Sequence, residues 1–273
     1  MKFSIICVYN NRKILDKWLL SSLKKQIFTN YELILVDNTS NSFDSMTDAL
    51  NYAGEKASGD YLMFVHQDVY LIGNDWLKKS ITYLKTLDKL GVAGVIGLTD
   101  KKDLLKPQRR INVIYHGYPP SKVEKCGNLI KYPTEVQTLD EMLLIVPKKV
   151  FDKIRFDSKL RGWHLYAVDY CLSVKVYLGL KVFVLPLRVW HRSKGRPLDE
   201  SYFNSLKYII QKFGRYFDKI YTTCGIWPTT GIKASLKINL IKTLSTLIKI
   251  LRIHKMLLFL PRHIRDLIFF ILL

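Results

Sequence analysis

Polar residues that could bind a nucleotide or a metal ion follow three apolar segments near the amino terminus. Residues 9–12 read YNNR, residues 37–40 read DNTS and residues 66–68 read HQD. Each group ends an apolar run, and ligands of open α/β sheets bind beyond the carboxyl ends of the strands. Carboxylates and amides at neighbouring strand ends would meet in one crevice. Such a crevice suits a base, a ribose and a phosphate-bound metal ion.

Asp68 is the most specific of these residues. It follows the apolar run 61–65, which is typical of a strand buried on both faces, so its carboxylate would emerge at the edge of the sheet. A hard divalent cation that carries a diphosphate needs only one or two protein carboxylates. Asp37 is more ambiguous, because Asp and Asn also end strands as turn formers and helix caps. Both interpretations of Asp37 stay open at this point.

The elements that must position these residues alternate along the first 100 residues. Apolar runs rich in β-formers are followed by segments whose apolar residues recur at helical spacing. This alternation predicts βαβ units and an α/β fold with a mainly parallel sheet. We expect strands at residues 3–9, 31–36, 61–65 and 91–97, and helices at residues 14–27, 44–57 and 75–87.

The remainder of the chain predicts loops, two further strands and a helical tail. Residues 100–137 are polar and contain four prolines, which favours loops over the site rather than core. Strands are expected at 142–146 and 181–185, with a helix at 167–178 between them. Segments 201–217 and 232–273 have helical patterns, separated by a Gly/Pro/Thr stretch at 225–231. We therefore expect a main domain over residues 1–218 and a basic helical tail over residues 219–273.

The composition is that of a folded protein with a strong positive charge. Of 273 residues, 48% are hydrophobic and 24% are charged, which excludes a disordered or collagen-like chain. The 43 Lys and Arg residues exceed the 23 Asp and Glu residues by 20. A net charge of this size points to nucleic acid, an anionic membrane or phosphorylated ligands. The four cysteines have no metal-site or redox spacing, so we expect reduced thiols in a cytosolic setting.

Much of the positive charge lies in the tail. Residues 219–265 carry nine Lys and Arg residues and no Asp or Glu. Leucines alternate with these cations in the pattern of an amphipathic helix, which can lie in the headgroup plane of an anionic leaflet. Helices packed on the domain or on a protein partner are the alternative. Because the chain lacks a run of ~20 apolar residues and a signal-peptide pattern, we expect a cytoplasmic protein, peripheral at the cytoplasmic face of the membrane.

Four segments, taken together, resemble family 2 glycosyltransferases. They read FSIICVYN at 3–10, ELILVDN at 32–38, ASGDYLMFVHQDV at 57–69 and GWHLYAVDYCL at 162–172. The last is followed by GLKVFVLP at 179–186 and VWH at 189–191. The resemblance implies the GT-A fold, a Rossmann-like mixed, mainly parallel sheet flanked by helices. It also implies transfer of a sugar from a nucleotide sugar with inversion.

The resemblance assigns roles to the polar strand ends. Asp37 would contact the base, and Asp68 would be the metal-binding last acid of an Asp-x-Asp motif, with Mn²⁺ or Mg²⁺ as the cation. His66 departs from the pattern, because it replaces the first acid of that motif, the residue that usually contacts the ribose. His191 matches a histidine that reaches the metal or the diphosphate, although a satisfied surface imidazole is the alternative. The implied donor-binding residues are Tyr9, Asn10, Asn11, Asp37, Asn38, His66 and Gln67.

An inverting transfer also needs a base that deprotonates the acceptor hydroxyl. Asp169 resembles the aspartate of the family's Glu-Asp motif, with Val168 where the glutamate would stand. The alternative is an acid placed favourably in the first turn of a helix. Asp140 and Glu141 form the second choice, as base or acceptor-binding residues, and His164 is a third.

The leading hypothesis is a metal-dependent transferase that moves a sugar from a nucleotide diphosphate sugar to a glycan or a lipid-linked acceptor. A basic nucleic-acid-binding protein and a membrane-surface scaffold are the non-catalytic alternatives. We expect no nucleic-acid partner, because no recognised motif is present and the cations cluster with Leu and Ile rather than with exposed aromatic residues. The loops at 100–137 are expected to decide specificity.

Overall fold

The computed structural model describes residues 1–100, 110–117, 124–192, 198–230, 237–243 and 246. The chain divides into two compact units, Met1–Lys194 and Gly195–Leu273. Each unit is described by itself below.

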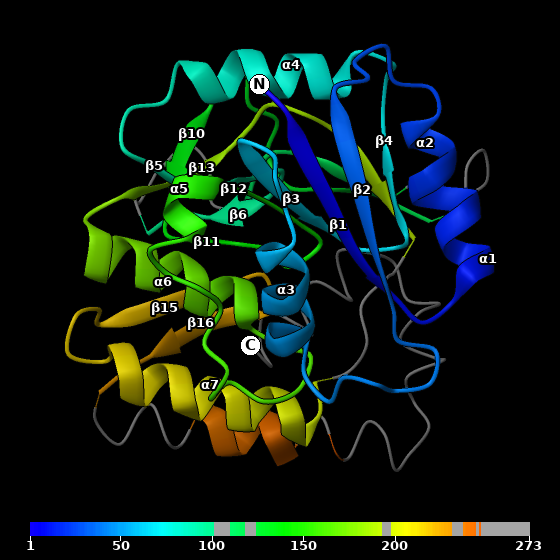
Figure 1. Ribbon diagram of the computed structural model, residues 1–273. Coiled ribbons are helices and arrows are strands. Elements are labelled where there is room, and N and C mark those ends of the chain that lie inside the picture. The colour runs from blue at the N-terminus through cyan, green and yellow to red at the C-terminus, as the bar shows by residue number, and fades with distance from the viewer. Residues whose placement is uncertain (101–109, 118–123, 193–197, 231–236, 244–245, 247–273) are drawn as a thin grey trace. The chain divides into compact units, whose positions relative to one another are not determined.

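A mixed seven-stranded sheet forms the centre of the first unit (Figure 1). Its strands lie in the order β10 (Thr134–Val136), β13 (Lys181–Val184), β5 (Leu90–Gly94), β12 (Leu143–Pro147), β3 (Tyr61–Val65), β1 (Phe3–Tyr9) and β2 (Tyr31–Asp37). Five strands run in one direction, whereas β12 and β10 run in the opposite direction. The expected α/β class with a mixed, mainly parallel sheet is therefore confirmed.

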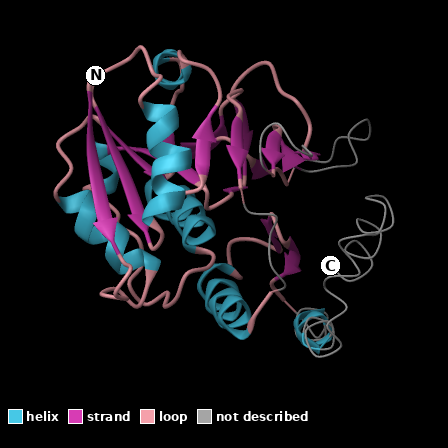
Figure 2. Cartoon of the chain, turned by 90° about the vertical axis from the view of Figure 1, so that its right-hand side faces the viewer, coloured by secondary structure: helices cyan, strands magenta, loops and turns pink. Residues whose placement is uncertain are grey.

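Helices flank this sheet (Figures 1 and 2). They are α1 (Arg12–Leu15), the π-helical turn η1 (Asp16–Leu20), α2 (Ser21–Leu23), α3 (Met46–Glu55), α4 (Trp76–Lys85), α5 (Lys148–Phe151) and α6 (Tyr166–Leu178). The start of α3 shows why its residues form a helix: Ser45 is the N-cap, and its hydroxyl accepts the N–H of Asp48 at 3.2 Å. The buried positions of α3 include Ala49, Leu50 and Ala53, and the helix packs against β1 and β2.

The core of this unit is built from the central strands. Phe3, Ile5 and Cys7 of β1 are fully buried in one apolar cluster, together with Met63 of β3. Alternate residues of a strand face opposite sides, so Ile6 points to the other face of the sheet. Ile6 is also fully buried, which shows that the sheet is covered on both faces. Among the described side chains, Cys7, Cys171 and Cys224 are free thiols.

Two small sheets include strands from the segment at 100–137 that was expected to form loops. One is a four-stranded sheet in the order β4 (Val69–Leu71), β14 (Val189–His191), β8 (Ile114–His116) and β9 (Glu124–Cys126). The other is a three-stranded sheet in the order β11 (Thr138–Leu139), β6 (Gly97–Leu98) and β7 (Arg110–Ile111). The expectation that residues 100–137 are loops without core is therefore wrong where they are described. Strands of two or three residues are too short for an alternating pattern to reveal them.

Asn112 shows how the segment between β7 and β8 is anchored. It is fully buried, and its amide nitrogen donates to the carbonyls of Val95, Leu185 and Leu187 at 2.7–3.0 Å. These bonds hold the start of β8 against the chain that leads to β14. The polar composition of the segment thus reflects internal hydrogen bonding as well as exposure.

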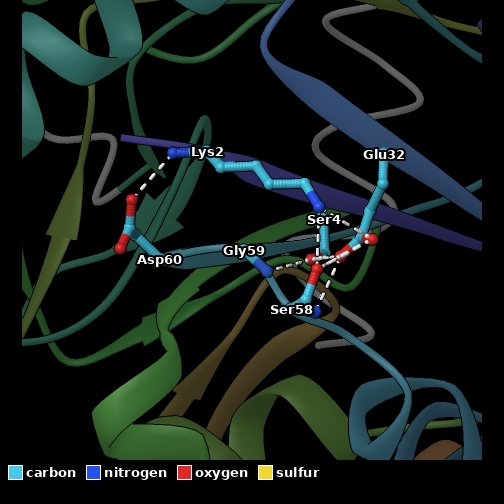
Figure 3. A network of polar contacts seen from close by, with 6 residues as sticks. All are labelled: Lys2, Ser4, Glu32, Ser58, Gly59 and Asp60. Carbon is cyan, nitrogen blue, oxygen red and sulfur yellow. Dashed lines mark hydrogen bonds and ion pairs between the residues drawn. The ribbon is translucent and has the colours of Figure 1, made fainter.

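A polar cluster joins the amino ends of β1, β2 and β3 (Figure 3). We call it the amino-edge cluster; it consists of Lys2, Ser4, Glu32, Ser58, Gly59 and Asp60. One Glu32 carboxylate oxygen accepts from the Ser4 hydroxyl at 2.5 Å and from the Ser58 N–H at 2.7 Å, and the other accepts from Lys2 Nζ at 3.0 Å. The Gly59 N–H donates to the Ser4 hydroxyl at 2.8 Å. The cluster therefore connects the starts of three neighbouring parallel strands.

The second unit contains a helix in the segment expected to be helical at 201–217 and a β-hairpin that the sequence patterns did not predict. Helix α7 (Glu200–Phe213) begins at Asp199, whose carboxylate accepts the N–H of Tyr202 at 2.9 Å. The strands β15 (Lys219–Thr222) and β16 (Gly225–Pro228) pair antiparallel, where a helical tail and a boundary stretch had been expected. Trp227 is fully buried, and its ring nitrogen donates to the Thr222 hydroxyl at 3.1 Å. Burial of this indole explains why the segment folds as a hairpin.

The described part of the tail is helical over residues 237–243. Ile238 and Ile241 are buried, whereas Leu240 is 58% exposed. Lys237 donates to the carbonyl of Ile226 at 2.8 Å, and burial lowers the pKa of its ammonium group. Within the described residues, no helix has the length and apolar character needed to cross a membrane. Residues 247–273, for which a continued helix was expected, lie outside the described residues.

Candidate active site

The predicted site residues meet at the carboxyl edge of the central sheet. β1 ends at Tyr9, which pairs with Asp37 at the end of β2. β3 ends at Val65, opposite Leu143 at the start of the antiparallel β12. The chain then continues directly into His66, whose N–H donates to the carbonyl of Met142 at 2.9 Å. The ends of β1, β2 and β3 and the start of β12 therefore define one edge, opposite the amino-edge cluster (Figure 1).

His66, Asp68 and His191 form a compact cluster at this edge. Each offers one ligand atom, and these atoms lie within 4.8 Å of one another. Asp68 precedes β4, and His191 ends β14, which pairs antiparallel with β4. His191 Nε2 lies 3.4 Å from an Asp68 carboxylate oxygen, with both side chains largely buried at 13% and 16% exposure. The fold thus brings HQD at 66–68 together with VWH at 189–191.

Burial and the neighbouring groups of the cluster shift the pKa values of Asp68 and His66. Burial opposes ionisation of Asp68, but the contact with His191 and the nearby imidazoles outweigh it and lower the pKa of the carboxyl to about 2. Burial, followed by the neighbouring His191, lowers the pKa of His66 below its ordinary value. Asp68 is therefore an anion near neutral pH, and His66 is a neutral imidazole with a lone pair.

The cluster fits a divalent cation. Carboxylates suit hard cations such as Mn²⁺ and Mg²⁺, and imidazoles bind first-row transition metals. His191 Nδ1 is buried and has no hydrogen-bond partner among the described residues, which is a costly state for a polar atom. Sequence reasoning had grouped His66 with the donor-binding residues. The structure also places its ring beside the two predicted metal ligands, with 6.0 Å between the ring centroids of His66 and His191.

Asp37, the predicted base-binding residue, is held by a hydrogen bond from Tyr9, a predicted donor-binding residue. The Tyr9 hydroxyl donates to one carboxylate oxygen of Asp37 at 2.8 Å, and the Thr39 N–H donates to the other at 2.9 Å. The bonds from Thr39 and Tyr9 lower the pKa of the Asp37 carboxyl. The Arg12 guanidinium lies 6.0 Å from the centre of the Tyr9 ring. This exposed carboxylate keeps its charge and acceptor capacity for a ligand.

Gln67 connects the ends of β1 and β3. Its amide oxygen accepts the N–H groups of Asn10 and Asn11 at 3.2 and 2.9 Å, and its amide nitrogen donates to the Asn10 side chain at 2.7 Å. Asn11 also caps α1, because its side chain accepts the N–H of Ile14 at 3.1 Å. These contacts bring together three of the predicted donor-binding residues and shape the loop after β1.

Asn38 differs from the other predicted donor-binding residues. It is 3% exposed, and both ends of its amide bond the backbone of Phe43, at 2.8 and 3.3 Å. The described contacts of Asn38 therefore close the loop after β2. Its contact with a donor stays a prediction.

The candidate bases differ in burial. Asp169 lies in the first turn of α6 and is only 2% exposed. Asp140 is partly exposed, accepts the N–H of Met142 at 3.1 Å and acts electrostatically on His66. The Glu141 carboxyl group accepts the N–H of Leu165 at the start of α6, and desolvation together with Asp140 raises its pKa to about 8. His164 is partly buried in the turn before α6. The catalytic roles of these four residues stay predictions.

Two residues of this edge were not predicted from the sequence. Tyr166 begins α6, and its hydroxyl lies 2.8 Å from His66 Nε2. His116 ends β8, pairs with His191 in the parallel register, and brings its ring to 5.7 Å from that of His191. Tyr166 lies in the segment GWHLYAVDYCL, but no sequence pattern was a reason to assign it a role. His116 lies in the segment that was expected to form loops. Neither residue has a sequence signal of its own, because only strand and helix packing brings it to the edge.

A family comparison decides the class of this chain. The model of a family described as "Glycosyltransferase like family" matches residues 4–213. The chain belongs to this family. Except for Phe3, the match covers the segments on which the resemblance to family 2 glycosyltransferases was based, so the chain is classified as a glycosyltransferase. The subgroup with His-Gln-Asp in place of Asp-x-Asp is not identified by this match.

Solved structures share the fold at low sequence identity. GalNAc-T7, solved with UDP, GalNAc and Mn²⁺, matches with a TM-score of 0.55 at 12% identity, over 77% of this chain and 48% of that chain. Residues 1–349 of TarS from S. aureus, solved with UDP-GlcNAc, match with a TM-score of 0.52 at 19% identity, over 78% and 66%. The mannosyltransferase PcManGT from Pyrobaculum calidifontis, solved with GDP-Man and Mn²⁺, matches with a TM-score of 0.53 at 12% identity, over 79% and 64%.

These likenesses support the GT-A-type fold. The chain spans about half to two thirds of the length of the structures it matches. No curated protein sequence matches it.

Proposed function

We propose that this glycosyltransferase moves a sugar from a nucleotide diphosphate sugar to a hydroxyl acceptor, with inversion and with a divalent cation. The observation that carries the proposal is the cluster of His66, Asp68 and His191 at the carboxyl edge, next to the Tyr9–Asp37 pair. The fold neighbours GalNAc-T7 and PcManGT, each solved with a nucleotide or nucleotide sugar and Mn²⁺, support the same class of donor and cofactor.

In this proposal Asp68, His191 and His66 hold Mn²⁺ or Mg²⁺. The cation supplies charge stabilisation for the diphosphate leaving group. Asp68 contributes a negative charge that persists at neutral pH, because its pKa is about 2. The two imidazoles contribute lone pairs without further charge, so that the site retains a net attraction for the diphosphate of the donor.

The donor lies along the ends of β1 and β2. The exposed Asp37 carboxylate is fixed by Tyr9 and Thr39 and is available to accept N–H groups of a base. Gln67 holds the backbone of Asn10 and Asn11, which fixes the loop that would line the nucleotide. Each group is oriented before a ligand arrives, which lowers the entropic cost of binding.

The acceptor must lose a proton to a carboxylate that it can reach. Asp169 is 2% exposed in this structure, whereas Asp140 is partly exposed and lies close enough to His66 to act on it electrostatically. Contact with the hydroxyl is a geometric requirement for a general base. We therefore propose Asp140 as the base ahead of Asp169. The acceptor class, a glycan or a lipid-linked sugar, is proposed from the family resemblance.

Metal-dependent binding of nucleotide sugars tests the proposal. A panel of UDP, GDP and dTDP sugars is screened for thermal stabilisation of the full chain with and without Mn²⁺ or Mg²⁺. We expect at least one donor to raise Tm only in the presence of the cation, and Asp68→Asn to abolish that shift. Asp60→Asn is the matched control, because Asp60 precedes β3 at the opposite edge and should leave the shift intact. A panel without any cation-dependent shift or turnover would refute the proposal.

We also propose that the tail associates with the cytoplasmic face of an anionic membrane. Support comes from the excess of cations over residues 219–265 and from Leu240, which is 58% exposed on a helix whose Ile238 and Ile241 are buried. The full chain should sediment with anionic vesicles and not with neutral ones, and salt should weaken the binding. Leu240→Glu should reduce sedimentation, whereas Tyr177→Glu, at a position on α6 that is 49% exposed, should not. Equal binding to neutral vesicles would contradict the electrostatic part.

A further inference from the structure

Tyr166 connects the metal-binding cluster to the start of α6. Its side chain is 3% exposed. Its hydroxyl donates to the backbone carbonyl of Glu141 at 3.0 Å and lies 2.8 Å from Nε2 of His66. These two contacts place one hydroxyl between a carbonyl oxygen and an imidazole nitrogen.

The protons of this chain of contacts can be assigned by counting. A tyrosine hydroxyl has one proton, and a carbonyl oxygen can only accept. The arrangement that makes both contacts sends the Tyr166 proton to the Glu141 carbonyl, so that the hydroxyl oxygen accepts from His66 and His66 Nε2 carries a proton. A neutral imidazole carries one proton, so Nδ1 is then the nitrogen with a free lone pair.

We propose that Tyr166 is a positioning residue that holds His66 in the Nε2–H tautomer and so presents the Nδ1 lone pair to the cation site of Asp68 and His191. The proposal rests on the proposed function for its metal-binding part. The tautomer itself depends only on the hydrogen bonds described above. Histidines that bind metals commonly donate their other ring N–H to a fixed acceptor, which sets both ring orientation and tautomer.

The position of Tyr166 is determined by its neighbours. The Glu141 carboxylate accepts the N–H of Leu165, a residue with a left-handed backbone conformation at φ 64°, and thereby fixes the start of α6. The Tyr166 ring also packs edge-on against Phe156, with 6.0 Å between the ring centroids. Glu141 thus anchors Tyr166 twice, once through its side chain and once through its carbonyl.

The alternative arrangement reverses the hydrogen bond. The hydroxyl proton would turn to His66 Nε2, the carbonyl of Glu141 would lose its bond from Tyr166, and His66 would carry its proton on Nδ1. In that case the nitrogen with the lone pair would face Tyr166 and not the cluster. The two arrangements therefore predict opposite tautomers of the same ring.

Nitrogen NMR of the full chain distinguishes them. In protein labelled with ¹⁵N-histidine, the His66 ring is assigned by comparison with His66→Gln. We expect the neutral Nε2–H tautomer in the wild type and a shift towards a mixture of tautomers in Tyr166→Phe. Tyr170→Phe is the matched control, because Tyr170 is a buried tyrosine on the same helix that donates to the carbonyl of Ile154 at 3.1 Å. A wild-type Nδ1–H tautomer, or an unchanged spectrum in Tyr166→Phe, would overturn the proposal.

Metal affinity is the second readout. Free Mn²⁺ is measured by electron paramagnetic resonance while the protein is titrated, without any substrate. We expect Tyr166→Phe to weaken Mn²⁺ binding about 10- to 100-fold and Tyr170→Phe to leave it within about twofold. Equal weakening in both variants would show a general loss of packing and would overturn the positioning role. Wild-type protein that does not bind Mn²⁺ would refute the proposed metal site, and the tautomer result would still decide the role of the Tyr166 hydroxyl.

Discussion

The two edges of the central sheet carry polar clusters of opposite character. At the amino edge, the Glu32 carboxylate accepts hydrogen bonds from Ser4, Ser58 and Lys2 (Figure 3). At the carboxyl edge, His191 Nδ1 is buried and has no hydrogen-bond partner among the described residues. Glu141, at the same edge, has its pKa raised to about 8. The first cluster is complete within the chain, whereas the second has polar capacity left for a ligand.

We therefore expect the amino-edge cluster to serve stability and the carboxyl edge to serve ligand binding. Buried polar groups stabilise a fold only when their hydrogen bonds are made, and an unmade bond costs about 1–3 kcal/mol. The amino-edge cluster makes its bonds between the strands themselves, so changes there should lower stability and leave ligand binding unchanged. Changes at the carboxyl edge should weaken ligand binding or activity and change stability little. Five predictions test this comparison.

The largest effect is expected for the candidate base. Asp140→Asn keeps an acceptor for the N–H of Met142 and removes the charge, so kcat should fall by about 10²- to 10⁴-fold with little change in Tm. Asp169→Asn should act mainly on stability, because Asp169 is 2% exposed. Steady-state kinetics and thermal melts of both variants provide the measurement. A larger loss of kcat in Asp169→Asn would restore Asp169 as the base.

Gly59→Ala should produce the largest loss of stability at the amino edge. A Cβ at this position would lie 2.6 Å from the Ser4 nitrogen and 2.7 Å from the Phe3 carbonyl carbon, both of them backbone atoms of β1. Overpacking of this kind costs about 1–3 kcal/mol. Chemical denaturation should show the loss, while Mn²⁺ affinity of the folded protein stays unchanged. Gly179→Ala, where no atom lies within 4 Å, is the control and should cost about 1 kcal/mol through its left-handed φ alone.

Glu32→Gln should weaken the fold in a pH-dependent way. Burial opposes its charge, but the bonds from Ser4, Ser58 and Lys2 together lower the pKa of Glu32 to about 2, from 4.5. The stability from a lowered carboxyl pKa is present above pH 4.5 and is lost as the pH falls towards 2. The variant should therefore be less stable than wild type by about 1–3 kcal/mol at pH 7 and equal to it near pH 2. A constant difference over that range would show that the charge is not the cause.

Glu141→Gln should show the opposite pH dependence. Desolvation, followed by Asp140, raises the pKa of Glu141 from 4.5 to about 8, so the folded protein holds a proton that the unfolded chain releases. Stability from this group is complete below pH 4.5 and is lost as the pH rises through about 8. The variant should match wild type at pH 5 and be more stable above pH 8, as measured by urea unfolding at each pH. Parallel pH profiles of the two proteins would contradict the raised pKa.

His191→Leu should have the smallest effect on stability. The substitution removes a buried nitrogen without a partner, which is favourable, and also removes the contact with Asp68, which is unfavourable. These opposed effects should leave the free energy of unfolding within about 1 kcal/mol of wild type. Mn²⁺ binding, by contrast, should be lost. A large loss of stability would show that this edge is as complete within the chain as the amino edge.

The long elements of the fold could be predicted from the sequence. The strands that became β1, β2 and β3 are apolar runs of five to seven residues, and α3, α4 and α6 have long amphipathic or apolar patterns. Such patterns are visible because burial of each face depends on residues close in the chain. The short strands β7 and β8 and the β15–β16 hairpin were missed. They depend on distant partners, such as the carbonyls bonded by Asn112 and the pocket filled by Trp227.

The candidate site could be predicted in part, for a related reason. Asp37 and Asp68 follow recognisable apolar runs, so residue type and strand position together indicated them, whereas His191 was indicated by the resemblance to the family. Tyr166 and His116 carry no local signal, and their closeness to His66 and His191 arises from the packing of α6 and β8 at the edge. Burial of Asp169 was likewise invisible, because a helix position does not show which face is covered.

By itself, the sequence determined the α/β class and the family and predicted the edge of the sheet that holds the candidate site, because alternation of buried strands and helices follows from local hydrophobic patterns. The tertiary structure alone decided which polar atoms are already paired. Glu32 and Glu141 have the same side chain, and the fold makes one a charged link between strands and the other an acid that retains its proton. That difference arises from desolvation and from hydrogen bonds between residues far apart in the chain, which no local pattern records.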